Sequence, residues 1–285
     1  MTEDMKPRLS DDAFRRLRDV IEGATGIHFP DRKRYFVEGR VRTMMTERGV
    51  ASFDDFARLV SGGGSSEGAL QSLIDAITIQ ETSFFRNPPM LDGFSGTVLP
   101  VLQGRRSLAD SRPLRVLSAG CATGEEPYTI AIMALDNHPG LVVEVTGIDV
   151  SSRAIAAARA GIWDRHSMRN MPWLYRDRWF VANGNGFRLR PDALERLGGA
   201  VRFKVASIVD RRAMATYAGM DVVFCCNVLT YFSDQARRIA VRNLCDSLLP
   251  GGWLFLAQTE VPEKAPPGFS PVLFHKVVAY RKDGS

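Results

Sequence analysis

The chain has 285 residues, of which 45% are hydrophobic and 24% are charged. This composition is typical of a soluble globular protein, and it excludes disorder over most of the length because a buried core is available. No apolar run approaches the ~20 residues that a membrane-spanning helix needs, and the polar start of the chain is unlike a secretory signal. The net charge of +5 favours an acidic partner without requiring nucleic acid.

The first 77 residues predict a small helical domain. Apolar side chains recur three and four positions apart, as on one face of a helix, at Phe14, Leu17 and Ile21. Ser10 can cap this helix, and a second helix is expected from about Arg32 to Arg48, where Gly49 can end it. Ser52 starts a third helix, and residues 67–77 form an amphipathic fourth.

After about residue 103 the pattern changes to strands that alternate with helices. Strands are expected at residues 114–118, 142–149, 201–206, 221–227 and 252–258. This alternation predicts a parallel sheet with helices on both faces, which is a doubly wound α/β fold. Residues 272–280 would add one strand at an edge of the sheet. Two alternating runs around the Asn/Gly turn at 183–186 predict a β-hairpin insertion at about residues 163–200.

The first strand of this region is followed by the turn AGCATGEE and a helix. Gly120 and Gly124 let the backbone approach a ligand closely, although a glycine pair alone fits an ordinary strand–helix turn equally well. The turn lacks the G-x-G-x-x-G spacing of dinucleotide sites, and Glu125 and Glu126 would repel a phosphate but attract an ammonium or sulfonium. Asp149 ends the next strand, where an acid can accept both ribose hydroxyls. The pattern therefore favours S-adenosylmethionine over NAD.

Neither a metal site nor a nucleophilic triad is indicated. The four cysteines lack the CxxC spacing of zinc sites and suggest no disulfide framework, so we expect a cytoplasmic protein without a metal: Cys121, Cys225, Cys226 and Cys245. The four histidines are scattered along the chain, and a structural or solvated position is the better interpretation of each.

Five stretches carry a specific family resemblance: ITIQETSFFRN, LSAGCATGEEPYTIA, GIDVSSRAIAAARAGIW, DVVFCCNVLTYF and LLPGGWLFLAQTE. In their order and spacing the chain resembles the bacterial chemotaxis receptor methyltransferases, the CheR family, over roughly residues 13–280. The resemblance implies a SAM-dependent enzyme that esterifies glutamate side chains on the acidic cytoplasmic helices of chemoreceptors, with S-adenosylhomocysteine as the product and no metal. It divides the chain into a helical docking domain at 1–86 and a Rossmann-like, SAM-binding methyltransferase domain at 87–285.

The resemblance also implies a set of site residues. Tyr231 and Arg86 are the expected catalytic residues. The expected cofactor-binding residues are Gln80, Thr82, Arg86, Gly120, Glu125, Asp149, Ser207, Ile208, Cys226 and Asn227. Within this set Glu125 would hold the amino group of the cofactor and Asp149 its ribose, and Tyr231 would stand near the sulfonium.

Several positions depart from the usual family pattern. Gln80 replaces an asparagine, Ser151 an aspartate, Ser207 an asparagine and Cys226 an arginine, and AQTE stands where Ser-Glu usually ends the motif. Cys226 is the most serious departure because it removes a charge from the site. Two alternatives therefore stay open, a non-catalytic signalling protein that binds SAM or S-adenosylhomocysteine, and a methyltransferase for another substrate.

Methyl transfer to a glutamate needs no general base, because a carboxylate with a pKa near ~4.3 is already ionised. The second helix carries six basic residues against two glutamates, a net charge of 6 − 2 = +4, which suits an acidic helical partner better than a merely solvated face. Arg34, Arg40 and Arg42 are the expected docking residues. No nucleic acid is expected, because aromatic residues are not interleaved with the charges. Some members of the family that the chain resembles carry a longer three-stranded subdomain here, which grips a short peptide tether of the receptor. The short hairpin turn of this chain favours the members that do not use such a tether.

Overall fold

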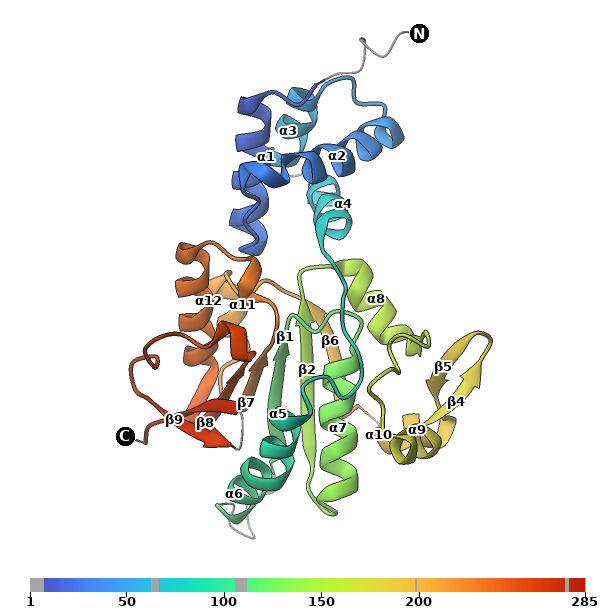
Figure 1. Ribbon diagram of the computed structural model, residues 1–285, viewed down its shortest axis with the longest axis vertical. Coiled ribbons are helices and arrows are strands. Elements are labelled where there is room, and N and C mark those ends of the chain that lie inside the picture. Colours follow the sequence, from blue (N-terminus) through green and yellow to red (C-terminus); the bar gives the residue numbers. More distant parts are fainter. Residues whose placement is uncertain (1–7, 63–66, 106–111, 198, 275–276, 285) are drawn as a thin grey trace.

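The computed structural model describes residues 8–62, 67–105, 112–197, 199–274 and 277–284. In Figure 1 the helical N-terminal domain lies above one end of the sheet of an α/β domain. Within the described residues, none of the helices combines the length and the apolarity needed to cross a membrane.

Four helices form the N-terminal domain: α1 (Asp11–Thr25), α2 (Arg34–Arg48), α3 (Phe53–Ser61) and α4 (Glu67–Ile77). Their starts follow the predicted caps, since the Ser10 hydroxyl accepts the Ala13 N–H at 3.1 Å and the Ser52 hydroxyl accepts the Asp55 N–H at 3.1 Å. A short 3₁₀ turn, η2 (Asp31–Lys33), precedes α2, which ends at Gly49 with φ +66°. The apolar faces meet in one core that includes Leu17, Ile21, Val37, Phe56 and Leu73.

The predicted doubly wound sheet is confirmed. Five parallel strands form its body: β1 (Leu114–Ala119), β2 (Val143–Asp149), β6 (Val201–Val205), β7 (Met220–Cys225) and β8 (Leu248–Leu256). The full strand order is β6-β2-β1-β7-β8-β10-β9. Alternate residues of β7 enter different cores, Phe224 on one face of the sheet and Val223 on the other. Both faces are buried, which is why these strands are continuous apolar runs in the sequence.

Helices cover the two faces of the sheet unequally. One face packs against α5 (Pro88–Gly93), the π-helical turn η3 (Phe94–Val98), α6 (Leu99–Gly104), α7 (Glu125–Asn137) and α8 (Ser152–Ala160). The other face packs against α11 (Arg211–Ala215) and α12 (Asp234–Ser247). The chain leaves β1 towards β2 and β6 and later returns to the other side of β1 as β7. Ligands of such sheets bind at the carboxyl ends of the strands where the order reverses.

The C-terminal prediction was wrong in one respect. Residues 272–280 were expected as one strand, but the structure has two antiparallel strands, β9 (Phe269–Phe274) and β10 (Val277–Lys282), and β10 pairs with β8. Residues 275 and 276 lie outside the described part of the chain. Only His275 and Lys276 separate the two apolar runs in the sequence, and neither is a residue type typical of a two-residue hairpin turn.

The predicted hairpin of the insertion is present as β4 (Phe180–Asn183) and β5 (Gly186–Leu189), flanked by α9 (Trp173–Trp179) and α10 (Pro191–Leu197). A third strand, β3 (Ile162–Trp163), pairs with β5 and makes a separate three-stranded antiparallel sheet. With two residues, β3 is too short to show an alternating pattern. The tether-independent type stays a prediction, because it rests on the short turn between β4 and β5, which the structure retains.

Alanine at Gly120 should destabilise the fold more than alanine at Gly140. Both glycines have positive φ, +75° and +84°, where an alanine costs about 1–2 kcal/mol. Only at Gly120 would the added Cβ collide, at 2.2 Å from Cγ2 of Val228, whereas nothing lies within 4 Å at Gly140. Thermal unfolding should therefore give a lower Tm for Gly120→Ala than for Gly140→Ala. Equal Tm values would show that Val228 moves aside without cost.

Candidate functional site

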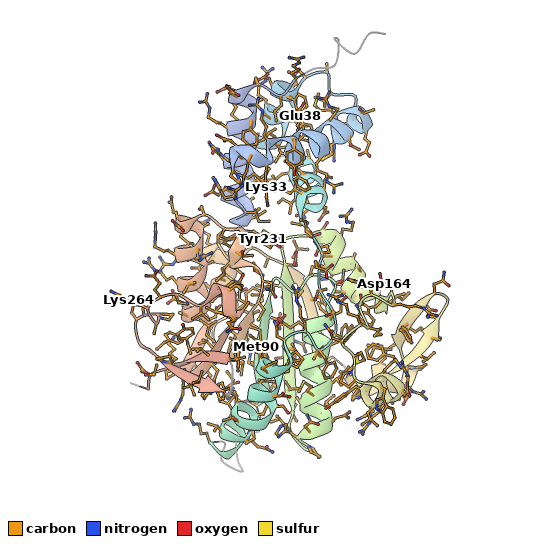
Figure 2. All side chains as sticks on the ribbon, viewed as in Figure 1. Lys33, Glu38, Met90, Asp164, Tyr231 and Lys264 are labelled. Atoms are coloured by element: carbon orange, nitrogen blue, oxygen red, sulfur yellow. The ribbon has the colours of Figure 1, made fainter. Side chains whose placement is uncertain are left out.

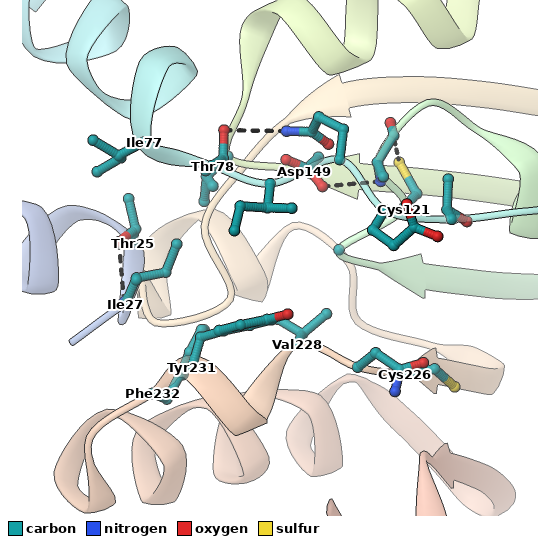
Figure 3. A pocket seen from close by; sticks show the side chains of 18 of the residues that line it. Thr25, Ile27, Ile77, Thr78, Cys121, Asp149, Cys226, Val228, Tyr231 and Phe232 are labelled. Atoms are coloured by element: carbon teal, nitrogen blue, oxygen red, sulfur yellow. Dashed lines mark hydrogen bonds between the residues drawn. The ribbon is translucent and has the colours of Figure 1, made fainter. Parts of the chain in front are cut away.

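A cavity of about 330 Å³ lies at the carboxyl ends of β1, β2 and β7, between the two domains. Figure 3 shows Asp149, Cys226 and Tyr231 around it, with Ile27 and Ile77 contributed by the helical domain. The segment of residues 78–86 also lines it, so both domains and their connection build one pocket.

The turn after β1 is tied to the end of β2. The Ala122 N–H donates to Oδ2 of Asp149 at 2.9 Å, and the Ser151 N–H donates to Oδ1 at 2.8 Å. These bonds hold Ala122 at φ +47°, a left-handed conformation that a non-glycine residue rarely adopts. Burial raises the pKa of Asp149 above its ordinary value of 3.8. Each carboxylate oxygen keeps acceptor capacity for a ligand hydroxyl.

The two glutamates that begin α7 lie in different surroundings. Glu125 is 0% exposed, and its carboxylate accepts hydrogen bonds from the Thr123 and Ser167 hydroxyls at 2.7 and 2.8 Å. Glu126 lines the pocket and accepts one from the Ser118 hydroxyl at 2.6 Å. Burial raises the pKa of Glu126 above its ordinary value, and the charge of Arg86 partly offsets this. Glu126, rather than Glu125, therefore presents a carboxylate to the pocket.

The loop after β7 carries Cys226, Asn227 and the 3₁₀ turn η4 (Leu229–Tyr231) along the wall of the pocket. Glu260, in the 3₁₀ turn η5 (Gln258–Glu260), is 2% exposed and holds this loop from behind. Its carboxylate accepts the N–H of Asn227 at 2.7 Å and that of Thr230 at 3.0 Å. Asn227 has φ +62°, so Glu260 stabilises a second strained residue of the pocket.

Cys226 lines the pocket beside Glu126, and its sulfur lies 3.5 Å from the sulfur of Met90. Burial and the neighbouring Glu126 raise the pKa of the Cys226 thiol well above its ordinary value. The thiol is therefore protonated at neutral pH and is not a nucleophile.

Aromatic packing fixes the segment that precedes α5. The Phe84 ring lies 4.9 Å from the rings of Trp163 and Phe180 in the insertion, and the Phe85 N–H donates to the Thr129 hydroxyl at 3.2 Å. Between Phe85 and Asn87, both with positive φ, Arg86 faces the pocket and donates to the Glu81 carbonyl at 2.7 Å. This geometry places a guanidinium in the pocket through a backbone that is strained on both sides.

Nine of the sequence-predicted site residues line this one pocket: Gln80, Thr82, Arg86, Gly120, Asp149, Ile208, Cys226, Asn227 and Tyr231. Two predicted residues, Glu125 and Ser207, are absent from the lining, and the Ser207 hydroxyl instead lies 3.4 Å from the Val209 N–H. Sequence reasoning assigned no role to Glu126 beyond its charge and none to Glu260. The signal for both was an acid in the turn of helix that follows an apolar strand, α7 after β1 and η5 after β8.

The three predicted docking residues differ in their surroundings. Arg34 pairs with Asp11 and donates to the Leu9 carbonyl, and Arg42 pairs with Glu38 at 2.6 Å. Arg40 is exposed, stacks over the Phe36 ring, and forms no ion pair with any described residue. Arg40 is therefore the predicted docking residue whose charge is free to meet a partner.

The pocket fits S-adenosylmethionine. Glu126 offers a carboxylate to a cationic group, Asp149 offers acceptors to ribose hydroxyls, and Ile77, Val150 and Ile208 offer apolar contact to a purine. The buried Oδ1 of Asn227 has no hydrogen-bond partner among the described residues, which leaves an acceptor for a ligand donor. Within the same part of the chain, no three His, Cys, Asp or Glu side chains gather as metal ligands would.

Replacing Glu126 should weaken cofactor binding, and Glu125 provides the matched control. Glu126→Gln removes a charge that faces the pocket, and a hydrogen bond to a charged group contributes about 1.5–3 kcal/mol, so SAM affinity should fall at least about tenfold. Glu125→Gln should leave affinity within about threefold. Because burial raises the pKa of Glu126 above 4.5, affinity should also begin to fall on acidification above pH 4.5. If calorimetry shows that Glu125→Gln weakens SAM binding more than Glu126→Gln does, then Glu125 is the residue that binds the cationic group of the cofactor.

Comparisons with known proteins agree with this site. The family model "CheR methyltransferase, SAM binding domain" matches residues 80–277, and "CheR methyltransferase, all-alpha domain" matches residues 12–78. The chain is 32% identical over 280 residues to chemotaxis protein methyltransferase 2 of Vibrio cholerae, covering 96% of this chain and 94% of that protein. It is 31% identical over 258 residues to the chemotaxis protein methyltransferase of Vibrio parahaemolyticus, covering 88% and 90%.

A third relative is the probable biofilm formation methyltransferase WspC of Pseudomonas aeruginosa. It is 34% identical to the chain over 239 residues, which cover 83% of this chain and 54% of that protein. The SAM-binding and all-alpha models together account for both domains seen in the structure. The chain belongs to the CheR methyltransferase family and is a SAM-dependent methyltransferase.

Proposed function

We propose that this protein transfers a methyl group from S-adenosylmethionine to glutamate side chains in the helical cytoplasmic region of a chemoreceptor. The observation that carries the proposal is the pocket at the reversal of strand order, where Glu126 and Asp149 face a cavity that also holds Arg86 and Tyr231. The names of the relatives, which include chemotaxis protein methyltransferases, support the same substrate class.

Each residue of the pocket has a proposed role. Asp149 accepts the ribose hydroxyls, Glu126 attracts the amino group, and Ile208 packs against the purine. When bound, the cofactor supplies a methyl group that a sulfonium activates for in-line displacement. Burial raises the pKa of Glu126, and the nearby charge of Arg86 offsets part of this rise, which favours the ionised carboxylate for the cofactor's cation.

The acceptor needs orientation more than activation. A glutamate with a pKa of about 4.3 is ionised at neutral pH, so no side chain of the enzyme has to remove a proton from it. Tyr231 is 44% exposed at the mouth of the pocket, where its hydroxyl can donate to one carboxylate oxygen and leave the other aimed at the methyl carbon. Closure of the mouth by a docked receptor helix would exclude water from the transfer.

The mouth itself suits an acidic amphipathic helix. Three exposed apolar side chains line the pocket from α2, from the connection after α4 and from η4: Tyr35 (74% exposed), Ile79 (66%) and Tyr231. Lys33 lines the same pocket and forms no ion pair with any residue that the structure describes. Figure 2 labels Lys33 in the helical domain and Tyr231 at the facing edge of the α/β domain. An apolar rim next to the free cation of Lys33 is complementary to carboxylates that alternate with apolar residues on a helix.

Tyr231→Phe should lower the rate of methyl transfer to receptor cytoplasmic fragments about tenfold or more, because a donor to a charged oxygen is lost. The matched control is Tyr280→Phe, since Tyr280 is buried in β10 and does not line the pocket. With a radiolabelled methyl group, the label should be released by mild base, as expected of an ester.

Two results would contradict this function. Base-stable label would indicate transfer to nitrogen on another substrate. Tight SAM binding without transfer to any fragment would support a non-catalytic signalling protein instead.

Reversal of one free charge tests receptor docking. Arg40→Glu should reduce kcat/KM for an acidic receptor fragment several-fold at low salt and much less at high salt, because steering between exposed charges is screened. SAM affinity should not change. Lys264→Glu carries the same charge change on the α/β domain, at a residue that lies away from the helical domain in Figure 2, and should have little effect. Equal losses of kcat/KM for Arg40→Glu and Lys264→Glu would show that only the net charge of the protein affects docking.

A further inference from the structure

A single carboxylate of the helical domain holds the start of α8. Oδ1 of Asp75, in α4, accepts the Ser151 hydroxyl at 2.8 Å and the Arg153 N–H at 3.2 Å, and Oδ2 accepts the Ser152 hydroxyl at 2.6 Å. The Arg153 guanidinium donates to the Asp75 carbonyl at 2.8 Å, and the Gln71 amide donates to the Val150 carbonyl at 2.9 Å. Burial alone would raise the pKa of Asp75, but the hydrogen bonds outweigh it and hold the pKa below 3.8.

Ser151 connects this contact to the cofactor pocket. Its hydroxyl donates to Asp75, while its backbone N–H donates to Asp149 at 2.8 Å. Asp149 and Val150 line the pocket, and so do Ile77 and Thr78, which follow Asp75 at the end of α4. One residue therefore lies between a carboxylate of the docking domain and the carboxylate that faces the ribose.

The pairing explains a departure from the family pattern, in which position 151 is usually an aspartate. An aspartate there would place a second carboxylate against Asp75, and like charges in a partly buried contact repel. Serine supplies a hydroxyl donor instead, and its oxygen still caps α8 by accepting the Ala154 N–H at 3.1 Å.

We propose that Asp75 is a positioning residue that sets cofactor affinity from the docking domain, through Ser151 and Asp149. The proposal rests on the assignment of the ribose to Asp149. Because coupling between two contacts is reciprocal, a cofactor that tightens Asp149 also tightens the attachment of α4 to α8. Cofactor binding thus prepares the docking domain to receive the receptor.

The first test measures S-adenosylhomocysteine binding by calorimetry. Asp75→Ala should weaken binding about 5- to 150-fold, the usual range of such coupling. Asp55→Ala is the matched control, because Asp55 is also an aspartate of the helical domain that accepts a serine hydroxyl, from Ser52 at 2.6 Å, but it does not line or adjoin the pocket. The affinity of Asp55→Ala for S-adenosylhomocysteine should equal that of the unaltered chain.

The second test separates positioning from a merely structural role by reversing the pair. Ser151→Asp alone should weaken binding, and adding Asp75→Asn should restore it, because the asparagine amide can donate to the new carboxylate while Asp still caps α8. Hydrogen exchange at residues 69–74 should slow on addition of S-adenosylhomocysteine in the unaltered chain. This slowing should be absent in Asp75→Ala.

Equal affinities for Asp75→Ala and the unaltered chain, both folded, would overturn this proposal alone. Failure of the double variant to bind better than Ser151→Asp would overturn it as well. If Asp75→Ala does not fold, the comparison of Ser151→Asp with the double variant still decides. Absence of binding by the unaltered chain would overturn the proposed function together with it.

Discussion

The structure depends on keeping three carboxylates buried at one end of the sheet. Burial raises the pKa values of Glu126, Asp149 and Glu260. Hydrogen bonds from backbone N–H groups and from the Ser118 hydroxyl offset part of the desolvation cost. Of the three, Glu126 and Asp149 line the pocket, so the uncompensated part of their desolvation favours a cationic ligand there. The same burial therefore costs stability in the free protein and creates selectivity for a cationic cofactor.

These carboxylates also hold the backbone in strained conformations. Asp149 accepts the N–H of Ala122, Glu260 accepts that of Asn227, and both donors have positive φ. A strained backbone conformation of this kind persists only where several surrounding contacts hold it in place. Because the strained residues line the pocket, the surrounding hydrogen bonds fix its shape before a ligand enters. The pocket is thereby pre-organised for an in-line transfer, which requires position rather than proton movement.

The helical domain is part of the site. It lines the pocket through Ile27 and Ile77, and the His28 N–H donates to the Tyr231 carbonyl at 2.9 Å. A receptor helix that docks on the helical domain, as proposed, would therefore meet Tyr231 at the same time. The contact of α4 with α8 gives the second attachment, so the interface between the domains adjoins the pocket at two places.

Local patterns in the sequence determined most elements, because caps and apolar periodicity act within a few residues. Ser10 and Ser52 start the helices that they were expected to start, and the five apolar runs are the parallel strands. The same patterns brought Asp149, Gly120 and Asn227 to one pocket, since parallel strands share their carboxyl ends. Only the tertiary structure decided between Glu125 and Glu126. Both lie in the first turn of one helix, and the Ser167 hydroxyl from a distant segment takes Glu125 out of the pocket. The sequence likewise did not indicate which residue contacts Ser151. Asp75 is 76 residues away along the chain and reaches Ser151 only when the two domains pack together.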